Sequence, residues 1–168
     1  MTKTKYEQSP GHPTQAQHRW PPARALVAED DDELRWLITR TLRRIGLDVV
    51  EARDGAALLD RAGEMMLSEQ ELAGLDLIVS DIRMPGWSGL DALAGLRHSG
   101  VGVPVVLITA FGDQQTHEQA RRLGATAIVD KPFEMEQLRD IVLQSLKMPE
   151  RQGARESAPD RGGRNATH

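Results

Sequence analysis

Short apolar segments alternate with longer segments of helical periodicity through the middle of this chain. The apolar segments are four to six residues long, rich in Val, Ile and Leu, and contain few polar positions. This composition is typical of strands that are buried on both faces of a parallel sheet. The five predicted strands are Ala25–Ala28, Leu47–Val50, Leu75–Val79, Val103–Ile108 and Ala125–Val129.

Between these strands, apolar residues recur every three or four positions, which is the spacing of an amphipathic helix. The clearest helical pattern runs from Leu34 to Ile45, and Gly46 follows it where a helix commonly ends. Strict alternation of strands and helices predicts a doubly wound α/β fold around a five-stranded parallel sheet. The other predicted helices include Ala57–Met66, Leu90–Leu96, a polar helix that ends at Gln119–Leu123, and Leu138–Leu146.

The predicted elements define one domain over residues 24–148, and both ends of the chain differ from it in composition. Residues 1–23 are rich in Pro, Gln and His, and residues 149–168 have almost no aliphatic side chains. Because so few apolar groups cannot offset the entropy cost of ordering, we expect both ends to be disordered.

Composition and charge narrow the classes of function. The chain of 168 residues has no cysteine, which excludes disulfides, thiolate metal sites and a cysteine nucleophile. Residues 25–149 carry 13 basic and 21 acidic side chains, a balance that disfavours direct DNA binding. No apolar segment approaches the roughly 20 residues of a membrane span, and the N-terminus lacks the apolar core of a signal peptide. We therefore expect a cytoplasmic protein without a membrane partner.

Polar residues follow the predicted strands at the edge of the sheet where doubly wound folds bind their ligands. Glu29 and Asp30 follow the first strand, Asp81 the third, Thr109 the fourth and Lys131 the fifth. Clustered carboxylates need a cation to remain ionised together, and a set of oxygen ligands favours Mg²⁺. With Lys131 as a positive charge and Thr109 as a hydrogen-bond donor, Asp81 is a candidate nucleophile for phosphoryl transfer.

Four segments in this order, LVAEDD, LIVSDIRMPGWSG, VVLITAFGD and IVDKPF, resemble the receiver domain of two-component response regulators over about residues 25–147. The resemblance implies a flavodoxin-like strand order 2-1-3-4-5 with helices on both faces of the sheet. It also implies a phosphorelay, in which a sensor histidine kinase or a histidine phosphotransfer protein supplies the phosphoryl group. A downstream protein target would read the face formed by the fourth helix, fifth strand and fifth helix.

The resemblance also assigns roles to individual residues. Asp81 would be the phosphoacceptor, Thr109 the switch hydroxyl, and Lys131 the lysine that contacts the phosphoryl group. The implied Mg²⁺ ligands are the carboxylates of Glu29, Asp30 and Asp81 and the backbone carbonyl of Arg83.

Further family properties concern the lifetime of the phosphorylated form. The domain would hydrolyse its own aspartyl phosphate, at a rate tuned by Arg83 and Phe111, and the Lys131–Pro132 peptide bond would be cis. We therefore expect a phosphoacceptor with intrinsic autodephosphorylation rather than an enzyme. Trp87, in the same loop as Arg83, is predicted either to lie beside the phosphoryl site or to cover the core.

Three features depart from the family pattern. Ile128 stands where the family has its switch aromatic, which puts the usual aromatic switch in doubt. The segment between the second strand and Asp81 is several residues longer than usual, and only a polar tail follows the last helix. A tail of this length cannot form an output domain, so we expect a stand-alone receiver.

Two alternative functions remain open at the level of the sequence. A Mg²⁺-dependent phosphohydrolase would also use Asp81 as its nucleophile, but haloacid-dehalogenase-type enzymes need a second aspartate where this chain has Arg83. A phosphorylation-independent adaptor would keep the receiver fold for docking alone. The candidate site residues disfavour an adaptor, whereas Ile128 and the long segment before Asp81 leave it open.

Other polar residues have structural interpretations. Asp31, Asp32 and Glu33 are predicted to cap the first helix, because acidic groups favour a helix N-terminus. Asp76 and Asp91 are predicted to be structural, and the five histidines, which have no ligand spacing, are expected on the solvated surface.

Overall fold

The computed structural model describes residues 22–67, 75–110 and 112–147. Residues 1–21 and 148–168, which include nearly all of the two predicted disordered ends, lie outside the described residues. Phe111 and residues 68–74, part of the long segment before the third strand, also lie outside them.

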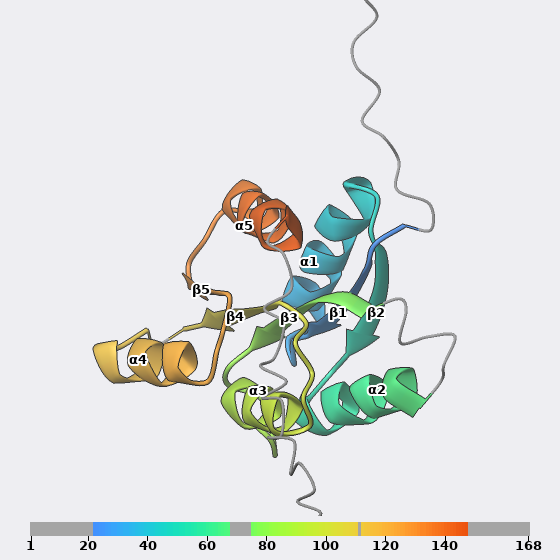
Figure 1. Cartoon of the computed structure of the whole chain (residues 1–168). Helices are drawn as coiled ribbons and strands as arrows, with labels where there is room; N and C mark the ends of the chain where they lie inside the picture. The colour runs from blue at the N-terminus through green and yellow to red at the C-terminus, as the bar shows by residue number, and fades with distance from the viewer. Residues whose placement is uncertain (1–21, 68–74, 111, 148–168) are drawn as a thin grey trace, which may run out of the picture.

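Five strands and five helices alternate along the described residues (Figure 1). The strands are β1 (Arg24–Ala28), β2 (Asp48–Ala52), β3 (Leu75–Asp81), β4 (Val105–Thr109) and β5 (Ala127–Asp130). The helices are α1 (Asp32–Arg44), α2 (Gly55–Leu67), α3 (Gly89–His98), α4 (Gln114–Arg122) and α5 (Met135–Lys147). Every predicted element is present, and the strand boundaries differ from the prediction by a few residues at most.

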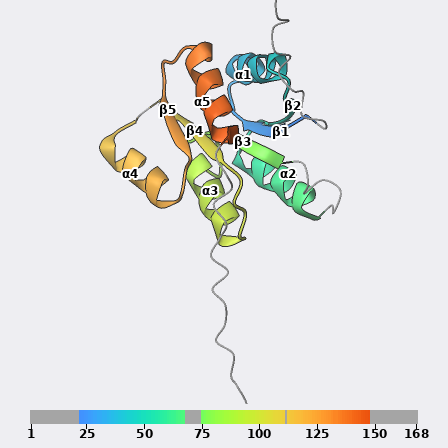
Figure 2. The ribbon, with the colours of Figure 1, turned by 45° about the horizontal axis from the view of Figure 1, so that its top comes forward.

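All strand pairs are parallel, and the sheet has the order β2-β1-β3-β4-β5. The predicted doubly wound fold and strand order are therefore confirmed. Helices α1 and α5 cover one face of the sheet, and α2, α3 and α4 cover the other (Figures 1 and 2). This arrangement explains why the strands have few polar positions, since both of their faces contact helices.

Two apolar clusters fill the space between the sheet and its helices, one on each face. Alternate residues of a strand point to opposite faces, so Leu26 and Ala28 belong to one cluster and Ala25 and Val27 to the other. These four side chains of β1 are at most 1% exposed. The central strands are thus fixed between two packed layers, which holds the polar ends of the strands in place.

Helix caps account for several of the acidic residues. Asp31 is the N-cap of α1 and accepts a hydrogen bond from the Leu34 N–H at 2.7 Å. Asp91 forms a capping box with Ser88 at the start of α3. The Asp76 carboxylate accepts the backbone N–H of Arg24 at 2.9 Å. The structural interpretations of these three acidic residues are therefore confirmed.

Among the described residues, no helix has the length and apolar character that crossing a membrane requires.

Candidate functional site

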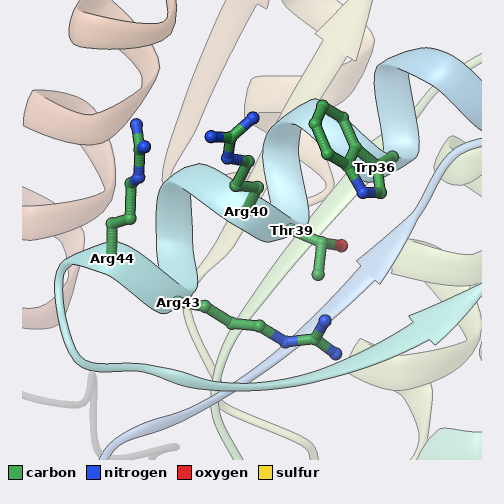
Figure 3. A pocket seen from close by; sticks show the side chains of 5 residues that line it. All are labelled: Trp36, Thr39, Arg40, Arg43 and Arg44. Carbon is green, nitrogen blue, oxygen red and sulfur yellow. The ribbon is translucent and has the colours of Figure 1, made fainter.

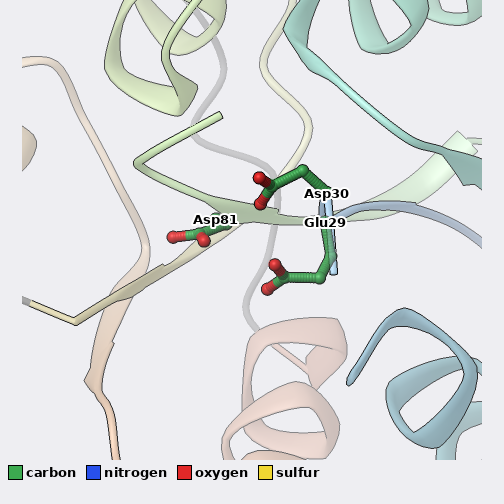
Figure 4. A group of neighbouring side chains, drawn as sticks. All are labelled: Glu29, Asp30 and Asp81. Carbon is green, nitrogen blue, oxygen red and sulfur yellow. The ribbon is translucent and has the colours of Figure 1, made fainter. Parts of the chain in front are cut away.

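Three carboxylates meet at the carboxyl edge of the sheet, where β1 and β3 end side by side. In the β1–β3 pair, Ala28 is opposite Ser80, so Glu29 and Asp30 leave β1 next to Asp81. One oxygen from each of the three carboxylates lies within 4.8 Å of the other two (Figure 4). Glu29 and Asp81 are buried and Asp30 is exposed, so the cluster is open to solvent on one side.

Lys131 connects this cluster to the end of β5, the strand at one edge of the sheet. Its Nζ donates to Asp81 Oδ2 at 2.9 Å and to Glu29 Oε2 at 3.0 Å, across 102 residues of sequence in the second case. Its backbone N–H donates to the carbonyl of Thr109 at 2.7 Å, and its peptide bond to Pro132 is cis, as the resemblance implied. The lysine therefore neutralises part of the negative charge that the buried carboxylates bring together.

Burial and charge alter the acidity of two of these groups. Burial raises the pKa of the Glu29 carboxyl, and the nearby charge of Asp81 adds to this effect, while the hydrogen bond from Lys131 opposes it. Burial alone would lower the pKa of Lys131, but its hydrogen bonds to Asp81 and Glu29 outweigh burial and raise it. Lys131 is therefore a stable positive charge at neutral pH, and the site retains excess negative charge that favours a cation.

Thr109 and Arg83 lie beside Asp81. Thr109 ends β4 and is 1% exposed, and its neighbour Ile108 is opposite Asp81 in the β3–β4 pair. The backbone N–H of Arg83 donates to Asp81 Oδ1 at 3.2 Å, which places this residue next to the carboxylate. The structure thus brings all of the predicted site residues together at one edge of the sheet.

The chemistry of the donor set fits a magnesium ion. Glu29, Asp30 and Asp81 offer only carboxylate oxygens, which are the ligands that Mg²⁺ takes in proteins. The described histidines are not part of this cluster, which disfavours Zn²⁺. These three carboxylates, with the carbonyl of Arg83 as the candidate that resemblance adds, are the residues that would hold the ion.

Arg35 supports the acidic cluster from α1, and sequence reasoning missed it. Its Nη1 donates to the backbone carbonyl of Glu29 at 2.7 Å, it contacts Asp32, and its Nε lies 3.6 Å from Glu51 Oε2. The guanidinium therefore ties the end of β1 to α1 and β2. An arginine in the first turn of a helix carries no sequence signal for such a contact.

Two glycines allow close approach around the loop after Asp81. A Cβ on Gly89 would lie 2.2 Å from the carbonyl oxygen of Asp81, and one on Gly55 would lie 2.0 Å from that of Trp87. Trp87 itself is 55% exposed, so it does not cover the core. Ile128 is half-buried and packs against the apolar cluster on the α2–α4 face.

One histidine contradicts the prediction of a solvated surface. The side chain of His117 is only 19% exposed, and its Nε2 lies 2.8 Å from Asp130 Oδ1. The prediction was wrong because the contact joins α4 to the end of β5 and depends on how the chain folds, not on local sequence.

A second surface feature lies on α1. A groove of about 340 Å³ is formed by side chains of this helix between Trp36 and Arg44 (Figure 3). The guanidinium of Arg40 lies 4.9 Å from the ring centre of Trp36. The residues that line the groove are Trp36, Thr39, Arg40, Arg43 and Arg44.

A buried carboxylate, two further acidic groups, a hydroxyl and a lysine at this edge of a doubly wound sheet define a domain equipped for phosphoryl transfer. Comparison with known proteins identifies the family. The family model described as "Response regulator receiver domain" matches residues 25–143, and the chain belongs to this family.

Several curated proteins and solved structures are similar to the chain. It is 33% identical over 125 residues to the response regulator protein PilR of Pseudomonas aeruginosa, covering 74% of this chain and 26% of PilR. It is 35% identical over 118 residues to the transcriptional regulatory protein PdtaR of Mycobacterium tuberculosis, covering 70% of this chain and 53% of PdtaR. The chain thus spans about a quarter of the length of PilR and about half of the length of PdtaR.

Solved structures agree with the fold. The signal receiver domain of the putative response regulator NarL from Mycobacterium tuberculosis has a TM-score of 0.65 at 28% identity, covering 75% of this chain and 97% of that one. The Francisella response regulator 1452 receiver domain has a TM-score of 0.65 at 26% identity, covering 75% of this chain and 97% of that domain.

Family membership decides among the functions left open by the sequence. It confirms a phosphoacceptor signalling switch and favours neither the phosphohydrolase nor the adaptor. Receiver domains of this family act with histidine kinases or phosphotransfer proteins and are generally signalling switches.

Proposed function

We propose that Asp81 of this receiver domain accepts a phosphoryl group from a phosphohistidine of a kinase or phosphotransfer partner. The contact of Lys131 Nζ with both Asp81 and Glu29 carries this proposal, because it places a positive charge 2.9 Å from the candidate nucleophilic carboxylate. Asp81 is 5% exposed, so its carboxylate is held by the strand end and is not free to rotate into bulk water.

The transfer is a direct displacement at phosphorus. An oxygen of Asp81 attacks the phosphorus, a P–O bond forms, and the P–N bond of the donor breaks. The departing imidazole takes the electron pair of that bond and is neutral, because its other nitrogen carries a proton. Lys131 Nζ and the Thr109 hydroxyl then donate hydrogen bonds to the phosphoryl oxygens.

We further propose that Glu29, Asp30, Asp81 and the carbonyl of Arg83 hold Mg²⁺. A bound Mg²⁺ supplies positive charge that offsets repulsion between the carboxylates and the phosphoryl oxygens. The raised pKa of Glu29 supports this, since burial without a second cation disfavours its ionised form.

Loss of the phosphoryl group completes the proposed cycle. A water in line with the P–O bond would attack phosphorus and regenerate the Asp81 carboxylate, with inorganic phosphate as the product. Arg83, whose N–H contacts Asp81 Oδ1, lies where its side chain can modulate access of that water. Phe111 is proposed for the same role.

The remaining proposals concern partners and extent. We propose that a downstream protein reads the face of α4, β5 and α5, and that the domain does not bind DNA directly, because residues 25–149 are acidic. We place the domain over residues 24–148. We also propose that the domain is located in the cytoplasm.

Intact mass spectrometry tests the proposal. We expect incubation with phosphoramidate or acetyl phosphate and Mg²⁺ to add one labile phosphoryl group, and chelation of Mg²⁺ or Asp81→Asn to abolish the addition. Asp60→Asn, which changes an exposed carboxylate of α2, is the matched control and should be phosphorylated like the wild type. Phosphorylation of Asp81→Asn at the wild-type level would contradict the proposal. So would the absence of phosphoryl uptake by the wild type from all donors, namely the two small molecules and the phosphorylated partner protein.

A further inference from the structure

The side chains of His117 and Asp130 join two elements that the sequence does not connect. His117 lies in the first half of α4, Asp130 is the last residue of β5, and Nε2 of the histidine is 2.8 Å from Oδ1 of the aspartate. A carboxylate only accepts hydrogen bonds, so His117 donates through Nε2–H. The His117 side chain is 19% exposed and the Asp130 side chain 54%, so the hydrogen bond is shielded from water only on the histidine side.

Asp130 is adjacent to both groups that would contact the phosphoryl oxygens. It precedes Lys131 in the chain and is opposite Thr109 in the β4–β5 pair. The Lys131 N–H also donates to the Thr109 carbonyl at 2.7 Å. Because of these contacts, a displacement of Thr109 would also displace the end of β5, where Asp130 lies.

Gly112 shows how closely the loop after Thr109 lies against this pair. A Cβ built on Gly112 would be 1.8 Å from Asp130 Oδ1 and 2.6 Å from His117 Nε2. The two side chains occupy the space that a Cβ would need, so a larger residue does not fit at this position. The loop thus packs directly on the His117–Asp130 hydrogen bond, with no room for even a methyl group.

We propose that the His117–Asp130 hydrogen bond is a latch that holds α4 and the loop at Gly112 in the position of the unphosphorylated protein. When Thr109 moves toward a phosphoryl group on Asp81, Gly112 moves with it, the hydrogen bond opens, and α4 is released. This relay from Thr109 to α4 rests on the proposed function, whereas the latch itself is a property of the unmodified protein. His117 and Asp130 are positioning residues in this scheme, because neither contacts the reacting atoms.

Two single variants open the latch by different means. His117→Ala removes the donor, and Gly112→Ala leaves both side chains in place but puts a methyl group where the hydrogen bond lies. Gly63→Ala, at a position with nothing within 4 Å of the added Cβ, is the matched glycine control. The measurement is hydrogen exchange of the α4 amides, with and without beryllofluoride and Mg²⁺ as a stand-in for the phosphoryl group.

In the unmodified protein, we expect both variants to speed exchange in α4 about 3- to 10-fold, the factor that one hydrogen bond of ordinary strength provides. The double variant should exchange no faster than either single one, because both changes act on the same contact. Alanine favours helix more than histidine does, so helix propensity alone would slow exchange in His117→Ala. Beryllofluoride should speed α4 exchange in the wild type and have little further effect in the variants.

The latch proposal is wrong if the α4 amides of either variant exchange at the wild-type rate. It is also wrong if the effects of the two substitutions on this rate add in the double variant. An equal response to beryllofluoride in wild type and variants would overturn the relay. Failure of the proposed function gives a different result: no phosphoryl uptake by mass and no response to beryllofluoride in the wild type. In that case, the α4 exchange rates of wild type and variants without beryllofluoride still show whether the latch exists.

Discussion

Lys131 illustrates how the site depends on the positions of single atoms. Its ammonium group contacts two buried carboxylates, and removing it would leave Glu29 and Asp81 without their hydrogen-bonded cation. The positive charge is therefore part of the site before any ligand binds. Asp81 is 5% exposed, and this charge lies against its carboxylate.

Gly89 provides a prediction at the same scale. A Cβ at this position would lie 2.2 Å from the Asp81 carbonyl oxygen and 3.0 Å from Ser80 Oγ, so Gly89→Ala forces the backbone at Asp81, the proposed phosphoacceptor, to move. We expect a loss of about 1–3 kcal/mol in the free energy of unfolding, the usual cost of overpacking. Urea unfolding followed by circular dichroism measures it, and phosphoryl uptake should slow. Gly63→Ala serves as control, and an equal effect of the two variants would contradict the prediction.

Sequence reasoning succeeded and failed at this scale for different reasons. Glu29, Asp81 and Lys131 stand directly at strand ends, and parallel strands carry their ends to one edge, so their approach followed from the periodicity. Arg35 and the His117–Asp130 contact were missed, because helix rotation and loop packing decide where those side chains lie.

At the scale of elements, the strands were easiest to predict, because double burial makes them continuous and apolar. The end of α4 was predicted near Leu123, but its start was not. A polar helix has no apolar pattern to mark where it begins. The structure shows that Asp113 sets the start, since its carboxylate accepts the Thr116 N–H at 2.7 Å.

This cap predicts a pH dependence of α4. The backbone hydrogen bond from Thr116 lowers the pKa of the Asp113 carboxyl below its ordinary value of 3.8. A lowered pKa in the folded state means that the stabilisation is complete above 3.8 and is lost as the pH falls through the lower folded value. The Thr116 amide shift in ¹⁵N–¹H NMR spectra should therefore titrate with a midpoint below 3.8.

Asp113→Asn is the control for this titration. Asparagine caps helices about as well as aspartate but does not ionise, so the acid titration at Thr116 should disappear while the helix remains. A midpoint at or above 3.8 in the wild type would contradict the role of the cap.

At the scale of the whole molecule, Arg97 joins loops that are distant in sequence. Its guanidinium donates to the carbonyls of Val101 at 2.6 Å and of Val103 and Gly124 at 3.0 Å each. Burial lowers the pKa of Arg97, yet the side chain keeps its charge because arginine titrates far above neutral pH. The loop before β4 and the loop before β5 are therefore fixed to one side chain of α3.

We expect Arg97→Met to lower the free energy of unfolding by about 2–3 kcal/mol, because it leaves carbonyls without their charged donor. Equilibrium unfolding in urea measures the loss, with Arg121→Met on the exposed side of α4 as the matched control. A loss no larger than that of the control would show that water replaces the guanidinium without cost.

The contact between Glu29 and Lys131 spans 102 residues, from the end of the first strand to the end of the last. During synthesis, a ribosome-bound chain presents its acidic residues long before β5 has emerged from the exit tunnel. Until then the Lys131 ammonium group is not present to contact Asp81 and Glu29. A chain that ends before Lys131 would therefore lack the positive charge that lies 2.9 Å from Asp81 Oδ2 in the folded domain.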